Sequence, residues 1–230
     1  LRGGMAGMRT SLDLARQSST PTLVVGCLRA LGRCLQAVGA DEEALACHRE
    51  GVELAGQISF GRGRGENLVE LGLAELACGR LPAARQDLRE AMRLARPHGP
   101  EMRAEVIAAW AELCLADGRV QPARALAALA QTLADQMDLR PLRVRALLLL
   151  GRALAAEFKD RPLSLTLLLT HTHWDHIQGL PFFTPLYEPK NHIRILGYEG
   201  ARQGLATILG NQMENPYFPI GLRELPSNVR

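Results

Sequence analysis

The stretch LGRCLQAVGADEEALACHREGVELA, residues 31–55, decides the fold of this chain. Gly39 divides it into two segments that are rich in residues with high helix propensity. In each segment apolar residues recur at positions i, i+3, i+4 and i+7, which predicts a helix with one buried stripe. Glycine suits the left-handed backbone conformation that ends a helix. The stretch therefore predicts a helical hairpin with a glycine turn.

The same pattern returns along the first two thirds of the chain. LGLAELACGRLPAARQDLREAMRLA begins at residue 71, WAELCLADGRVQPARALAALAQTLA at residue 110, and a shorter start, LGRALAAE, at residue 150. Equivalent positions hold a turn glycine (Gly39, Gly79, Gly118) and a small residue after it (Ala44, Ala84, Ala123). A period near 40 residues with paired helices predicts an α-solenoid.

These repeats resemble the tetratricopeptide-repeat (TPR) family. The resemblance is carried by the LG pairs at residues 31–32, 71–72 and 150–151 and by the alanine after each turn, and it covers roughly residues 20–157. The third unit departs from the pattern with Trp110–Ala111. The resemblance implies a concave groove that binds a protein or peptide partner.

The composition changes near residues 158–161, which predicts two domains, 1–158 and 159–230. Pro162 disfavours helix at the residue before it, so the fourth repeat is cut short. The apolar run 163–170 is expected to form a buried strand. Between the first and second repeats, FGRGRGENL resembles a phosphate-binding glycine motif but follows a helix, and we interpret it as a flexible inter-repeat loop.

Directly after the expected strand comes the motif His171-Thr172-His173-Trp174-Asp175-His176. Zinc prefers imidazole nitrogen and carboxylate oxygen ligands. Two histidines spaced two apart can reach one ion, and the Asp and His that follow can reach a second ion nearby. The pattern therefore predicts a metal site rather than a set of exposed loop histidines.

The motif and the residues after it, about 163–230, resemble the metallo-β-lactamase superfamily of hydrolases. The resemblance implies that His171 and His173 bind a first metal ion and that Asp175 and His176 bind a second. It also implies a catalytic role for Asp175 in holding the nucleophilic water or moving its proton. The implied cofactor is Zn²⁺, as one or two ions, with Mn²⁺ or Fe as alternatives. Small-molecule or phosphodiester substrates are implied as well. The expected fold is mostly α: a TPR-like α-solenoid followed by a partial α/β metallo-β-lactamase-like segment.

The superfamily's pattern is incomplete in this chain. A third histidine and a bridging acid are not found at the expected spacing, and the single later histidine, His192, is expected to be exposed at the start of a strand. We therefore expect weak metal affinity and little turnover.

Three hypotheses about the function of this chain stay open. The first is a metal-dependent hydrolase recruited by its repeats. The second is a non-enzymatic interaction module that carries a hydrolase remnant. The third is an incomplete piece or a join of two reading frames.

Composition limits the partners and the cellular location that are expected for this chain. The net charge of +3 comes from arginines interleaved with acids, which disfavours nucleic acid as a partner. The five cysteines are odd in number and form no CxxC pair, so reduced thiols are expected. The sequence shows no apolar run of membrane-spanning length and no signal-peptide pattern. We therefore expect a cytoplasmic protein with no membrane partner.

Overall fold

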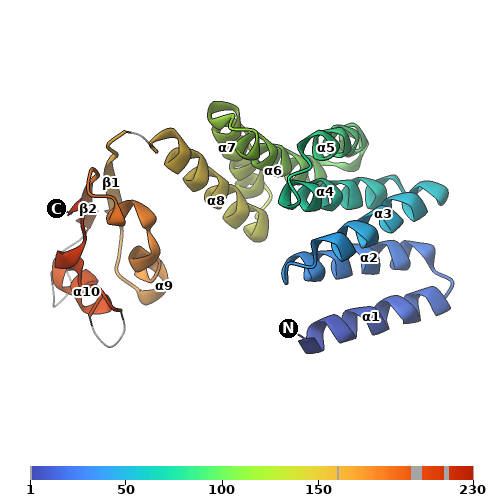
Figure 1. Ribbon diagram of the computed structural model, residues 1–230, viewed down its shortest axis with the longest axis horizontal. Coiled ribbons are helices and arrows are strands. Elements are labelled where there is room, and N and C mark those ends of the chain that lie inside the picture. The colour runs from blue at the N-terminus through green and yellow to red at the C-terminus, as the bar shows by residue number, and fades with distance from the viewer. Residues whose placement is uncertain (1, 160, 198–203, 215–217, 230) are drawn as a thin grey trace. The chain divides into compact units, whose positions relative to one another are not determined.

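The computed structural model describes residues 2–159, 161–197, 204–214 and 218–229, with the side chains of residues 2–4 and 175 excepted. The chain divides into two compact units, Leu1–Ala156 and Glu157–Arg230 (Figure 1). The first is helical, and the second combines a small sheet with short helices. Within the described residues, no helix combines the length and hydropathy needed to cross a membrane.

The helical unit begins with α1 and ends with α8. Its helices are α1 (Arg2–Gln17), α2 (Pro21–Gln36), α3 (Asp41–Gln57), α4 (Gly61–Ala77), α5 (Leu81–Ala95), α6 (Pro100–Ala116), α7 (Val120–Gln136) and α8 (Arg140–Glu157). Helices α2 and α3, α4 and α5, and α6 and α7 pack as hairpins, each pair in close contact. The predicted repeat of helix, turn and helix is confirmed. The repeat pattern does not predict helix α1, which precedes the first repeat.

Each hairpin turns at the predicted glycine. Gly39, Gly79 and Gly118 have φ values of 75°, 72° and 69°, in the left-handed region where a side chain would be strained. In each turn the amide of the following residue donates to a carbonyl near the end of the first helix, as in Ala40 N–H to the Leu35 oxygen at 2.9 Å. The glycines are therefore required by helix ends that close in the same way.

The glycine of the LG pair makes room for the second helix of its hairpin. A Cβ on Gly32 would lie 2.3 Å from Cε1 of His48, and a Cβ on Gly72 would lie 2.9 Å from Cγ of Leu88. In the third hairpin Ala111 takes the same position and packs in one core cluster with alanines of α7. The small residue thus sets how closely the two helices approach.

The prediction of a flexible loop for FGRGRGENL is wrong. Helix α4 begins at Gly61, and the glycines that suggested a loop lie within its first two turns. A Cβ on Gly63 would lie 2.3 Å from the ring of Phe60, and a Cβ on Gly65 would lie 1.8 Å from Cε of Met102. These glycines therefore serve close packing between helices, and the helix tolerates their low propensity because tertiary contacts stabilise it.

The second unit contains a parallel sheet in the order β1 (Ser164–Leu169), β2 (His192–Gly197) and β3 (Asn228–Val229). Strand β1 pairs with β2 from Ser164 opposite His192 to Leu169 opposite Gly197. Helices α9 (Trp174–Ile177) and α10 (Leu205–Gln212) and three 3₁₀ turns complete the unit. Its main core cluster is built on four buried residues: Leu186, Ile193, Met213 and Leu225.

A strand at 163–170 is confirmed, but its predicted burial is wrong. Exposed and half-buried residues alternate along β1, and Leu168 is 75% exposed. Leu165 and Leu167 pack on the core of the unit, while the opposite face of the strand meets solvent. An uninterrupted apolar run normally indicates a parallel strand covered on both faces, and here the described residues cover one.

Candidate functional site

Charged side chains form a network along the first helices of the hairpins and along α8. They are Arg29 and Arg33 on α2, Arg62, Glu66 and Glu70 on α4, Glu101, Glu105 and Glu112 on α6, and Arg145 and Arg152 on α8. We call this set the first-helix face. Spacings of four or seven residues place the members from one helix on the same side of it. Helix α4 contacts both α2 and α6, so the first helices lie next to one another.

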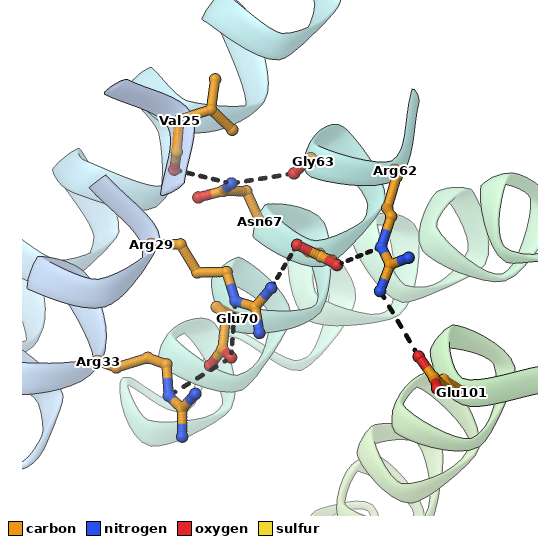
Figure 2. Close-up of polar contacts among 9 residues, drawn as sticks. Val25, Arg29, Arg33, Arg62, Gly63, Asn67, Glu70 and Glu101 are labelled. Atoms are coloured by element: carbon orange, nitrogen blue, oxygen red, sulfur yellow. Dashed lines mark hydrogen bonds and ion pairs between the residues drawn. The ribbon is translucent and has the colours of Figure 1, made fainter. Parts of the chain in front are cut away.

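Ion pairs join neighbouring helices across this face (Figure 2). Arg29 of α2 donates to one carboxylate oxygen of Glu66, and Arg62 donates to the other at 2.9 Å. Arg62 also reaches Glu101 of α6, with 3.6 Å between its guanidinium and the carboxylate. Two arginines and two acids thus link three successive first helices.

Glu70 is a largely buried acid of the face, with 15% of its side chain exposed. Figure 2 shows Arg29 and Arg33 directed toward it, each with Nε 3.7 Å from its carboxylate. Burial raises the pKa of Glu70 above its ordinary value, although Arg33, Arg29 and Arg145 oppose the rise, and the nearby Glu105 adds to it. Glu70 is therefore a desolvated carboxylate whose arginine partners stand at the outer limit of ion pairing.

The far end of the face is basic again. Arg145 and Arg152 of α8 both contact Glu112 of α6, at 2.9 and 3.3 Å. Glu105, half-buried on α6, has no ion-pair partner within the described part of the chain. The face therefore presents acids on α4 and α6 between arginines on α2 and α8.

Beside this face lies a buried polar contact that serves packing. The side-chain amide of Asn67 donates to the carbonyl oxygens of Gly63 at 3.0 Å and Val25 at 3.5 Å (Figure 2). His48 is fully buried next to it, and burial lowers the pKa of His48 to about 4. A neutral, inaccessible ring over Gly32 has a structural role.

The histidine motif lies in the other unit and runs from the turn after β1 into α9. His173 precedes the first residue of α9, and His171 follows the end of β1, with Nδ1 3.0 Å from the Thr170 hydroxyl. The ring centroid of His171 lies 4.9 Å from that of His173 and 4.2 Å from that of His176, in edge-to-face contacts. All three rings are exposed, and the side chain of Asp175 lies outside the described residues.

The structure gathers the three predicted histidines without showing a metal centre. Among the side chains that are described, no group of three or more His, Cys, Asp or Glu residues is arranged to hold a metal ion. A pocket of about 240 Å³ adjoins His176 and is otherwise lined by apolar side chains and Gly179. The predicted His192 is exposed at the start of β2, as expected. The ligand roles of His171, His173, Asp175 and His176 stay predictions.

Sequence reasoning did not identify the first-helix face. A signal was present, because the repeat register aligns Gly26, Glu66, Glu105 and Arg145 at one position of successive units. That position changes chemistry from repeat to repeat. A position of this kind is typical of a surface free of packing constraints.

No protein-family model matches the sequence, and a search of curated proteins gives no match. Solved structures do match. A Podosopora anserina protein described as a kinesin light chain with nearly identical TPR-like repeats is 19% identical, with a TM-score of 0.50. The alignment covers 69% of this chain and 80% of that one.

The helical unit is a TPR-like repeat solenoid. The Q17M variant of the same protein agrees, with 18% identity, a TM-score of 0.51, and coverage of 69% of this chain and 79% of that chain. At these identities the likeness shows the fold alone. The comparisons give no support to a metallo-β-lactamase domain, and the described part of residues 163–230 holds a three-stranded parallel sheet with short helices.

Proposed function

We propose that this chain is a TPR-like interaction module that binds an extended segment of a partner protein along the first-helix face. The observation that carries the proposal is the pattern of half-buried charges on that face. Glu70 and Glu105 stand near its middle, one with distant arginine partners and the other with none described. Partly desolvated carboxylates of this kind favour a cationic ligand group.

The arginines on α2 and α8 add positive charge at the two ends of the first-helix face, on either side of the acids of α4 and α6. A segment with a central Lys or Arg and acidic residues on each side would match the acids of α4 and α6 and the flanking arginines. Such complementarity sets the register and specificity of binding more than its raw strength. The described lining of the pocket beside His176 is otherwise apolar side chains and Gly179, whereas the first-helix face offers charged groups to a ligand.

The test is selection from a random peptide phage library with the full chain as bait. We expect enriched peptides to carry a central basic residue, and we expect Glu105→Gln and Glu70→Gln to weaken a synthesised hit by about tenfold or more. Glu50→Gln is the matched control. Glu50 lies on α3, the second helix of the first hairpin, and forms an exposed ion pair with Arg16 of α1. Absence of enrichment, or equal loss in all three variants, would refute the proposal.

A second proposal concerns the histidine loop. We infer that His171, His173, Asp175 and His176 bind one or two divalent metal ions, Zn²⁺ first, with Mn²⁺ or Fe as alternatives. The spacing of the motif supports this, as does the meeting of the three rings at the end of β1. Exposed ligands are solvated and mobile, so the proposed affinity is modest.

Calorimetric titration of the full chain with ZnCl₂ tests this second proposal. We expect micromolar binding that is lost in His171→Ala and in His176→Ala but kept in His192→Ala, the exposed histidine of β2. Equal heats in all variants would contradict the assignment. A catalytic role for Asp175 and a hydrolytic activity are separate matters, and hydrolysis of bis(p-nitrophenyl) phosphate that Asp175→Ala abolishes would support them.

A further inference from the structure

Two acidic residues of the second hairpin occupy positions that are apolar in the other two hairpins. Glu75 on α4 is only 4% exposed, and Asp87 on α5 is half-buried. By repeat register these positions hold Leu35 and Cys47 in the first hairpin and Cys114 and Leu126 in the third. Leu35 and Cys47 pack in one apolar cluster. The second hairpin therefore has two carboxyl groups where the others have a packing contact.

The carboxyl groups of Glu75 and Asp87 lie in hydrogen-bonding contact, and we call them the carboxyl pair. Glu75 Oε2 is buried, and no group of the described residues donates to it. Glu75 Oε1 lies 3.7 Å from the guanidinium of Arg49 on α3. Ionised carboxylates can only accept hydrogen bonds, so a hydrogen bond within the pair requires a proton. Without that proton, a charged oxygen is buried with no donor, which is costly.

Few positive charges act on the carboxyl pair. The cations that act on its α4 member are Arg49 and Arg80, and Arg80, in the hairpin turn, also donates to Glu42 of α3. Glu90, one turn further along α5, adds negative charge beside the pair, although Arg64 contacts it at 2.7 Å. The surroundings therefore do not supply the positive charge that two ionised carboxylates would need.

The other helices that contact α4 and α5 direct their charges elsewhere. The arginines of α2 pair with Glu66 and Glu70, Glu101 of α6 reaches Arg62, and Asp117 after α6 pairs with α5 through Arg85. His48 of α3 lies against Gly32 of α2.

Within this setting burial is the main cause that raises the pKa of Glu75, to about 7, and Asp87 adds to the rise. Arg49 and Arg80 oppose it. Burial also raises the pKa of Asp87 above its ordinary value. Two acids in contact, one of them buried, cannot both ionise easily, which agrees with the missing donor at Glu75 Oε2.

We propose that Glu75 and Asp87 share one proton at neutral pH and that this proton clamps α4 to α5. Its loss at higher pH leaves two anions in contact, and their repulsion loosens the hairpin near its turn. The contribution to stability is present below pH 4.5, the ordinary value for Glu, and is lost as the pH rises toward 7. The second hairpin is thus a pH-sensitive joint of the solenoid, independent of any partner on the first-helix face.

Trp110 of α6 can report on this joint. Its indole N–H donates to the carbonyl of Leu88 at 3.3 Å, and Leu88 follows Asp87 in the sequence. Trp174→Phe leaves Trp110 as the only tryptophan of the full chain. We expect its emission to change in one step with a midpoint near pH 7. Quenching by acrylamide should be about twofold stronger at pH 8.5 than at pH 5.5, because the hairpin is looser.

Variants of the carboxyl pair decide the outcome. Glu75→Gln keeps the shape of the side chain and donates to Asp87 at every pH, so the step should vanish and quenching should stay low at pH 8.5. Asp87→Asn, at a less buried position, should also remove the step. Infrared difference spectra between pH 5.5 and 8.5 should show the band of a protonated carboxyl group in the parent chain that Glu75→Gln lacks.

His98→Gln is the control, because histidine ordinarily titrates in this pH range and His98 lies in the turn between α5 and α6. The step should persist in this variant. A step that Glu75→Gln and Asp87→Asn both keep, or one that His98→Gln removes, would overturn the inference. So would a parent chain that shows no step in emission or no carboxyl band.

Discussion

At the scale of single residues, a glycine or an alanine in the first helix of each hairpin fixes how closely the two helices approach. Gly72 lies against Leu88 with no room for a Cβ, whereas the third hairpin uses alanine at both equivalent positions. The two facing positions therefore vary together. Glycine faces a large side chain, and alanine faces alanine. The glycine of the LG pair is therefore required for helix packing and is not a functional motif.

Adding a methyl group at Gly72 should destabilise the helical unit. We expect Gly72→Ala to lower the free energy of unfolding by about 1–3 kcal/mol, because the new Cβ would overlap Leu88. The double variant Gly72→Ala with Leu88→Ala should be more stable than the sum of the two single changes implies. Urea unfolding followed by circular dichroism measures this, with Gly26→Ala as the control expected to gain up to about 1 kcal/mol. Additive effects would argue against the contact.

His48 should make the fold sensitive to acid. Burial lowers the pKa of His48 from 6.5 to about 4, so between these values the unfolded chain binds a proton that the folded chain does not. Its contribution to stability is present above pH 6.5 and is lost as the pH falls toward 4, with a slope of at most about 1.4 kcal/mol per pH unit.

Replacing His48 by leucine should remove that part of the acid sensitivity. Leucine is the residue that the second hairpin places over its own glycine, so His48→Leu should fold normally. Urea unfolding at pH 7.0, 5.5 and 4.5 compares the variant with the parent chain. His98, which is partly exposed outside the hairpins, provides His98→Leu as the control. An unchanged pH slope in His48→Leu would contradict the prediction.

At the scale of elements, the sheet depends on one buried side chain between the strands. The Oδ1 of Asn191 accepts from the Leu163 amide at 2.9 Å, and its Nδ2 donates to the Pro185 carbonyl at 2.9 Å. Its own carbonyl accepts from the Asn228 amide at 3.0 Å. Asn191 thus links the start of β1 to the chain before β2.

Removing this link should loosen β1. We expect Asn191→Ala to cost about 1–3 kcal/mol, because it leaves buried amide and carbonyl groups without partners. Hydrogen exchange read by mass spectrometry should show faster exchange in peptides covering β1 and β2. Asn211→Ala, an exposed asparagine on α10, should leave exchange there unchanged. Equal protection in Asn191→Ala and the parent would count against the role of Asn191.

At the scale of the whole molecule, each unit has a core of its own. One main cluster of the helical unit is built from residues of α4, α5 and α6, and the main cluster of the second unit is built around Ile193 and Leu186. The structure separates the units near residue 156. Units with separate cores can unfold in separate steps.

Thermal unfolding should therefore show two transitions. We expect Leu88→Ala, which opens a cavity in the helical unit, to lower one midpoint and leave the other in place. Ile193→Ala should do the reverse, because Ile193 is buried in the second unit. Differential scanning calorimetry measures both midpoints. A single transition that both variants shift by similar amounts would show that the units unfold together.

Repetition made the helical unit predictable. The turn glycines, the small residues facing the second helices and the end of the solenoid before Pro162 all follow from positions that recur every 39 or 40 residues. A recurring position reports a recurring backbone requirement, and local sterics are enough to interpret it. The strand at 163–170 could be predicted for a similar reason, since it depends on local pattern.

Other features depend on contacts between residues that are distant in sequence. The glycines of α4 indicated a loop because their partners, such as Met102, belong to another helix. The burial of β1 could not be inferred from an apolar run, because burial depends on what covers each face of the sheet. The charge pattern around Glu70 arises only when α2, α4, α6 and α8 bring their side chains together.

By itself, the sequence determined that this protein is a helical repeat followed by a segment containing a strand and a histidine loop, because period and local sterics are written in consecutive residues. Only the tertiary structure decided which charges share a face and that the three histidine rings meet. Those properties depend on distances through space, which the packing of distant segments sets.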